Sequence, residues 1–173
     1  HFHLKNYGKR QDMINLKKIN SIDKIVGLIK EKINSNPNIN WIEGFGWDHN
    51  LWGGKYPTAN VLNSISENHP IALTRIDGHS MWVNDIAINS TNHTIVELNN
   101  LSGGQVINDC ILIDNAMYPV IKIMPDDNVN DIKRWIRVAV ENANKMGITN
   151  VHDAWQDAYV IEAINLLSFI DSL

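Results

Sequence analysis

The sequence has little cysteine, no excess of basic charge and no long hydrophobic run. Its 173 residues include one cysteine, Cys110, which excludes an intramolecular disulfide framework and a four-cysteine zinc site and favours a cytoplasmic protein. No apolar run approaches the roughly 18 residues of a membrane-spanning helix, so no membrane partner is expected. The 15 Lys and Arg residues, against 19 Asp and Glu, form no dense stripe, which argues against a nucleic-acid partner held by phosphate contacts.

The chain does have enough apolar residues to bury a core. Hydrophobic residues make up 44% and charged residues 20%, which is typical of a folded domain rather than a disordered chain. No internal repeat or interdomain linker is visible, so residues 1–173 are expected to form part of one domain. The first residue is His rather than Met, which predicts a piece of a longer protein or a processed product.

Apolar periodicity predicts alternating helices and short strands, an α/β pattern. Ser21 is the expected N-cap of the first helix. The segment 90–108 is polar and is predicted to be a loop. Helices are predicted at 21–34, 80–88 (weakly), 130–146 and 158 to the C-terminus, and strands at 40–46, 71–76, 110–113 and 148–151.

The segment 130–151 gives the strongest local prediction. Asn130-Asp131 would cap a helix that Gly147 ends, and a strand would follow, which is the αβ half of a parallel α/β unit. The expected buried face of this helix consists of Ile132, Trp135, Ile136, Ala139, Ala143 and Met146.

Histidine and aspartate collect just after the predicted strands. Asp48-His49, Asp77-Gly78-His79 and His152-Asp153 each follow one of them. In a barrel of parallel strands the carboxyl ends meet on one face, where active sites form, so these residues would share a site. Each pair also has a structural interpretation: Asp-Gly is typical of a turn, and His152 can simply be satisfied by the neighbouring carboxylate.

The pair His1-x-His3 is the clearest candidate for a metal site. A spacing of two points both imidazoles to the same side of an extended strand, and neutral imidazole is a good zinc ligand. The alternative is two unrelated surface histidines. Elsewhere, the aromatic segment 41–52 is consistent with core or a lid, and its glycines lack the frame of a phosphate loop, so nucleotide binding is not supported.

Five blocks, in order along the whole chain, resemble motifs of the YtcJ-like (amidohydrolase 3) branch of the metal-dependent amidohydrolase superfamily. The five together are far more specific than any one of them. They are HFHL (1–4), GWDHNLWGGKYPT (46–58), HPIALTRIDGHSMWVN (69–84), LIDNAM (112–117) and GITNVHDA (147–154).

The resemblance implies a partial (β/α)8 TIM barrel with an inserted loop-rich segment. It implies a hydrolase that uses a metal-activated water on non-peptide carbon–nitrogen bonds, with a small amide or formamide as substrate. His1 and His3 would be the first two ligands of a divalent metal, with zinc expected. The implied substrate contacts are Trp47, Asp48, Trp52, Asp77, His79, Trp82 and His152.

Departures from the family pattern leave alternatives open. The remaining family ligands (a lysine, two histidines and an aspartate) would lie beyond residue 173, so this chain alone is expected to be inactive. A second interpretation is a non-catalytic fragment or degenerate relative that keeps the fold without hydrolysis. A third is another chemistry of the same barrel, such as deamination of a ring.

Overall fold

The structure is a computed structural model that describes residues 1–154 and 156–170. The chain forms two compact units: one contains residues 13–125, and the other combines residues 1–12 with the segment from residue 126 onward. The prediction of a helix reaching the C-terminus is confirmed as far as residue 170, and its last three residues lie outside the described range. No helix in the described ranges is both long and apolar enough to cross a membrane.

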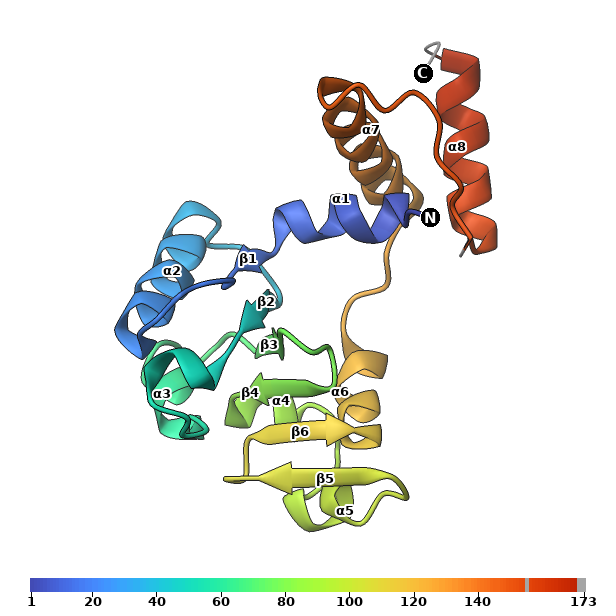
Figure 1. The fold of residues 1–173 in the computed structure, drawn as a ribbon. Coiled ribbons are helices and arrows are strands. Elements are labelled where there is room, and N and C mark those ends of the chain that lie inside the picture. Colours follow the sequence, from blue (N-terminus) through green and yellow to red (C-terminus); the bar gives the residue numbers. More distant parts are fainter. Residues whose placement is uncertain (155, 171–173) are drawn as a thin grey trace. The chain divides into compact units, whose positions relative to one another are not determined.

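Residues 13–125 are built on an open six-stranded sheet with the order β1-β2-β3-β4-β6-β5 (Figure 1). The first three strands are parallel, whereas β4, β6 and β5 run antiparallel to their neighbours. The fold is therefore mixed α/β, and this sheet is not a closed barrel. The strands are Ile14–Asn15, Ile42–Trp47, Ile71–Arg75, Ser80–Val83, Gly104–Ile107 and Ile111–Asp114 for β1 to β6.

Helices cover both faces of this sheet. Because side chains alternate along a strand, Ile71 and Leu73 face one hydrophobic cluster with α2 and α3, while Ala72 faces the other with α4, α5 and α6. The Ser21 side chain caps α2 as predicted. The helices are α2 Ile22–Ser35, α3 Ala59–Asn63, α4 Asp85–Asn89, α5 Ile95–Asn99 and α6 Tyr118–Ile123, with 3-10 turns at His49–Trp52 and Asn115–Met117.

Two local predictions in this unit are wrong. The predicted helix at 80–88 is strand β4 followed by the short helix α4, because β4 pairs on both sides and is buried throughout. The predicted loop at 90–108 contains α5 and β5. A capping box between Thr94 and Glu97 starts α5, so the inserted segment is more regular than expected.

The second unit packs three helices together: α1 (Leu4–Asp12), α7 (Val129–Lys145) and α8 (Ala158–Ile170). The predicted buried face of α7 is confirmed except for Met146, which is 77% exposed because it follows the last helical residue. Asn128 rather than Asn130 caps α7. The strand expected at 148–151 is absent from these described residues, and a single parallel bridge joins Phe2 to Asp153 instead.

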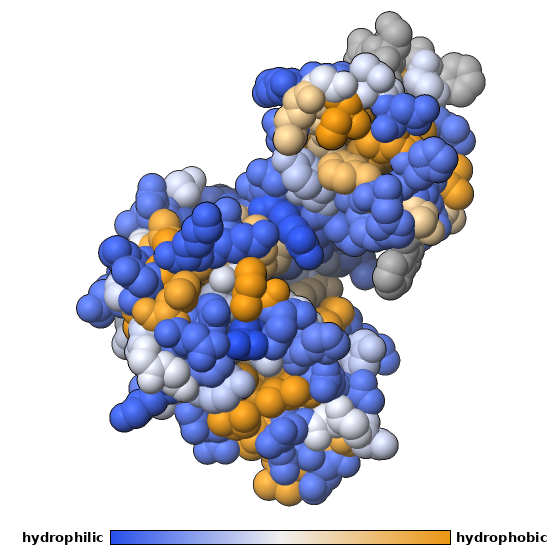
Figure 2. Space-filling view, viewed as in Figure 1, coloured by the Kyte–Doolittle hydropathy of each residue, from blue (hydrophilic) through white to orange (hydrophobic). Residues whose placement is uncertain are grey.

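This second unit exposes apolar side chains. Hydrophobic residues are visible at the surface over α7 and α8 in Figure 2. α8 is apolar nearly all round: Val160, Ala163 and Leu167 are buried, while Tyr159 and Ile161 are exposed. Helices with this composition are ordinarily buried on most sides.

Candidate functional site

The histidine pair at the start of the chain converges on one point. The Phe2 N–H donates to the carbonyl of His152 at 3.0 Å, and this extended pairing places His1 and His3 on the same side. Their Nε2 atoms lie 3.1 Å apart and their rings meet edge to face. The expectation that both imidazoles point the same way is therefore confirmed, while their role as metal ligands stays a prediction.

The two imidazoles fit a shared divalent ion as part of a ligand set. Two nitrogens at about 2.0–2.1 Å from one tetrahedral ion lie about 3.4 Å apart, so a small adjustment suffices. They are not a complete set: within residues 1–154 and 156–170, no three or more His, Cys, Asp or Glu residues form a group that could hold a metal ion.

The Asp153 carboxylate lies beside His3. One carboxylate oxygen lies 3.6 Å from His3 Nδ1, and the other accepts the Leu4 N–H at 3.0 Å. The Asp153 side chain is only 4% exposed, so it is fixed in place. A carboxylate behind a ligating histidine fixes its ring and makes it a better ligand. The sequence pattern indicates Asp153 only as a companion of His152, and the contribution of His152 here is its backbone carbonyl.

Lys5 is a second residue beside this pair that sequence analysis missed. A cavity of about 220 Å³ is lined by His3, Lys5, Asn6, Asp157 and Val160. The Lys5 ammonium lies 3.0 Å from Asp157 and 3.1 Å from Asp127. Burial by itself lowers the pKa of Lys5, but hydrogen bonds to these two carboxylates outweigh it and raise that pKa.

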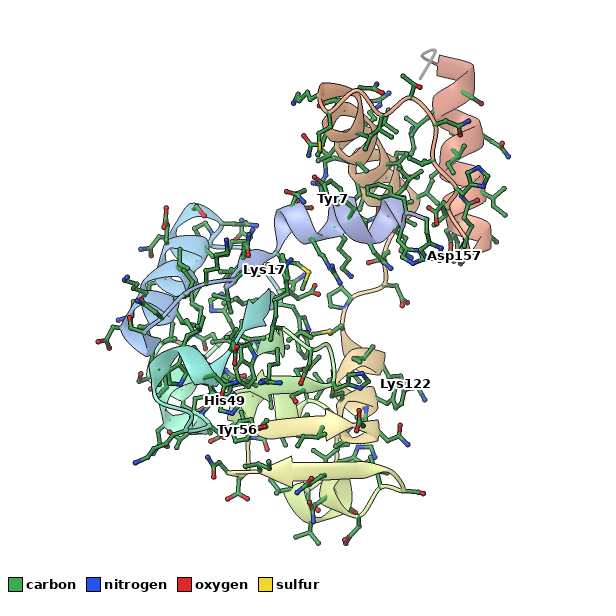
Figure 3. All side chains as sticks on the ribbon, in the orientation of Figure 1. Tyr7, Lys17, His49, Tyr56, Lys122 and Asp157 are labelled. Atoms are coloured by element: carbon green, nitrogen blue, oxygen red, sulfur yellow. The ribbon has the colours of Figure 1, made fainter. Side chains whose placement is uncertain are left out.

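The Asp157 side chain, labelled in Figure 3, both caps a helix and pairs with a lysine. Its carboxylate accepts the Val160 N–H at the start of α8 and the Lys5 ammonium, and these bonds, in that order, lower its pKa. The sequence could have indicated Asp157 as a helix cap, because it lies just before the helix predicted from residue 158, where aspartate is a common cap.

The three tryptophans among the implied substrate contacts lie in residues 13–125. Trp47 and Trp82 are fully buried, and their indole N–H groups donate to the carbonyls of Leu73 and Thr58. Trp52 stacks on Trp47 with 6.2 Å between ring centroids. The burial of Trp47 favours the interpretation of the aromatic segment 41–52 as core.

A guanidinium joins the polar residues that follow β2 and β3. Arg75 forms an ion pair with Asp77, lies 3.4 Å from Asp48, and donates from Nε to His49 Nδ1 at 3.3 Å. The Asp77 carboxylate also accepts the His79 N–H at 2.9 Å, so the Asp-Gly-His segment is a turn. The structure thus brings Asp48, Asp77 and His79 together, through an arginine that sequence analysis did not select.

These contacts set the protonation of the cluster. Burial lowers the pKa of His49, and the Arg75 charge lowers it further. His49 also stacks on Tyr56, with 4.2 Å between ring centroids (Figure 3). Burial alone raises the pKa of Asp77, but the His79 N–H and Arg75 outweigh it and lower that pKa. Burial and Arg75 therefore favour the neutral form of the His49 imidazole.

His79 forms its own exposed pair. Its Nδ1 lies 2.8 Å from the Asp114 carboxylate, and the two side chains are 74% and 51% exposed. Asp114 has a φ of 49° and a ψ of −116°, a positive-φ conformation that a non-glycine residue adopts at an energetic cost. Of the nine predicted site residues, His1, His3 and His152 belong to one unit and the other six to residues 13–125.

Comparison with known proteins identifies the family of this chain. A family model described as the Amidohydrolase family matches residues 1–164, so this chain belongs to the amidohydrolase family. Among curated proteins it is 26% identical over 161 residues to the putative amidohydrolase YtcJ of Bacillus subtilis (strain 168), and 27% identical over 159 residues to the Arabidopsis thaliana protein LONG AFTER FAR-RED 3. Each match covers 88% of this chain but only 30% and 27% of those relatives.

Two solved structures share the fold. An uncharacterized metal-dependent hydrolase from Pyrococcus furiosus is similar with a TM-score of 0.70 and 25% identity, over 96% of this chain and 33% of that one. Another from Pyrococcus horikoshii OT3 gives a TM-score of 0.73 and 23% identity, over 98% of this chain and 32% of that one. The chain thus spans about a third of the length of each.

Proposed function

We propose that this chain is the amino-terminal part of a metal-dependent hydrolase that acts on non-peptide carbon–nitrogen bonds in small amides or formamides. The observation that carries the proposal is the convergence of His1 and His3, with Nε2 atoms 3.1 Å apart and Asp153 behind His3. The family match and the similarity to proteins described as metal-dependent hydrolases support it.

The second unit would form the start of a β/α barrel. The extended residues around Phe2 run parallel to Asp153, and α1 and α7 lie between them in sequence, as in a strand–helix–strand crossover. Residues 13–125 would then be an insertion within this crossover. The exposed apolar residues of α8 would be covered by later strands and helices of the barrel.

His1 and His3 would hold the divalent ion, and zinc suits a pair of imidazoles. A bound ion of this kind would supply a Lewis acid that polarises a carbonyl group and activates water. Asp153 would keep the His3 ring in position, with its Nε2 lone pair toward the ion. The Lys5–Asp157 pair would form one polar wall of the adjoining cavity.

The test is hydrolysis of a panel of small amides and formamides by the full-length protein, followed as release of amine and carboxylate. His3→Ala should lower kcat/KM about a hundredfold or more, and Asp153→Asn about 10- to 100-fold. His69→Ala is the matched control, because His69 lies in residues 13–125 and its ring is hydrogen-bonded to Ser66. The activity of this variant should equal that of the unmodified protein. A full-length protein that binds no metal and hydrolyses none of the panel would contradict the proposal and favour a non-catalytic relative.

A further inference from the structure

A second cavity, separate from the histidine pair, lies beside α6 in residues 13–125. Its volume is about 820 Å³, within the roughly 300–1,000 Å³ typical of small-molecule sites. Half of its lining residues are apolar, namely Leu101, Tyr118, Pro119, Ile121 and Ile123. The cavity therefore offers a hydrocarbon-binding wall to a ligand of ordinary metabolite size.

The apolar wall is exposed although α6 itself is held firmly. Val120, in the middle of α6, is fully buried in the cluster with α4 and α5. Tyr118, Ile121 and Ile123 on the same short helix are 64%, 45% and 36% exposed. Contiguous apolar side chains that stay in contact with water commonly mark a binding surface.

The charge at this cavity is opposite in sign to that of the chain. The chain has a net charge of −4, yet none of the lining residues is a carboxylate. The lining contains Lys122, on α6 (Figure 3), and His93. Within the described part of the chain Lys122 forms no ion pair, so its ammonium is available to an anionic group. A lining with one ammonium and no carboxylate favours an anionic ligand.

The polar side of the cavity is preformed. His93 Nδ1–H donates to the Thr91 carbonyl at 2.8 Å, and the His93 backbone N–H donates to the Thr91 hydroxyl oxygen at 3.1 Å. The Thr91 hydroxyl in turn donates to the carbonyl of Ile88 at the end of α4. A polar edge fixed before binding costs less conformational entropy when a ligand arrives.

We infer that this cavity binds a small organic carboxylate with an aromatic or branched hydrocarbon body. The body lies against Tyr118, Ile121 and Ile123, and the carboxylate pairs with the Lys122 ammonium. The inference does not depend on the proposed hydrolysis, because none of these residues belongs to the unit that contains His1 and His3.

The test is an NMR titration of the full-length protein, labelled at isoleucine methyl groups, with 4-phenylbutyrate and with its neutral amide, 4-phenylbutyramide. We expect saturable shifts of the Ile121 and Ile123 methyl signals with the carboxylate, and at least about tenfold weaker binding of the amide. Lys122→Glu and Lys122→Gln should both weaken carboxylate binding about tenfold or more. Lys55→Glu is the matched control, because Lys55 is exposed and is not among the lining residues, so it should leave binding unchanged.

Three outcomes would overturn the inference. The first is the absence of saturable shifts at Ile121 and Ile123 up to the solubility limit of the probe. The second is equal binding of acid and amide, which would identify a purely apolar docking surface. The third is unchanged carboxylate binding in both Lys122 variants, with the remaining methyl spectrum showing that they are folded.

Discussion

At the scale of single residues, Arg75 determines the electrostatics of the loops after β2 and β3. Its guanidinium contacts Asp48, His49 and Asp77 together. A sequence pattern points to the aspartates and histidines because they follow predicted strands. It does not reveal the arginine, because Arg75 is the last residue of β3 and its contact with Asp48 depends on the parallel pairing of β2 with β3.

Replacing Arg75 should raise the pKa of His49. Burial and the Arg75 charge lower this pKa, whereas Asp48 and Asp77 raise it. In Arg75→Gln burial still lowers this pKa but the opposing Arg75 charge is gone, so the His49 resonance should titrate at higher pH in an NMR pH series. Lys30→Gln removes an exposed charge from α2 and should leave that titration unchanged. An unchanged or lower His49 pKa in Arg75→Gln would refute this assignment.

The same shift has a consequence for stability. The pKa of His49 is lower in the folded protein than the value of about 6.5 for the unfolded chain, so the unfolded state takes up the proton more readily. This contribution to stability is therefore present above about pH 6.5 and is lost as the pH falls through the unfolded and then the folded pKa. In Arg75→Gln the free energy of unfolding should therefore decrease less as the pH falls.

Two glycines in helices should respond to alanine with opposite signs. A Cβ at Gly8 in α1 would lie 2.0 Å from the backbone oxygen of Trp135 in α7, so Gly8→Ala should lower the free energy of unfolding by about 1–3 kcal/mol or more. A Cβ at Gly27 in α2 meets nothing within 4 Å, so Gly27→Ala should raise it by about 0.5–1 kcal/mol. Urea unfolding, followed at resonances of each unit, measures both. Equal effects would mean that α1 and α7 do not pack as described.

At the level of helices and strands, helix caps and strand pairing determine which secondary structure a segment adopts. The amphipathic pattern predicted α2 and α7 well because it is long and regular. α1 was missed because its polar sequence has a central glycine, Gly8, and its packing against α7 is a tertiary effect. β4 was missed because its short apolar run fits a helix or a strand, and its two neighbouring strands decide between them.

Removing the helix cap Asn84 should lower the free energy of unfolding more than removing the helix cap Asn128. The buried Asn84 accepts the N–H groups of Ile71 and Ala87 and donates to the His69 carbonyl. Asn84→Ala therefore leaves several buried groups unsatisfied and should cost about 3 kcal/mol. The exposed Asn128 caps α7 through the Asp131 N–H, and Asn128→Ala should cost about 1 kcal/mol. Urea unfolding compares them, and equal losses would contradict the buried network around Asn84.

At the scale of the whole molecule, local patterns were predictable and long-range topology was not. The spacing of His1 and His3 predicted their convergence because the period of two is a property of any extended segment. Whether all the polar strand ends belong to one sheet depends on which strands pair, and the sequence does not reveal that pairing. The structure instead builds β1 to β6 as an open mixed sheet and pairs Phe2 with Asp153 in the other unit.

Zinc titration of the full-length protein tests whether His1 and His3 together bind one divalent ion. The imidazole resonances of His1 and His3 should shift together and saturate at one zinc per chain. These shifts should be lost in the double variant His1→Ala/His3→Ala and retained in His69→Ala. Zinc that leaves both resonances in place, or that binds the double variant equally well, would rule out a metal site shared by His1 and His3.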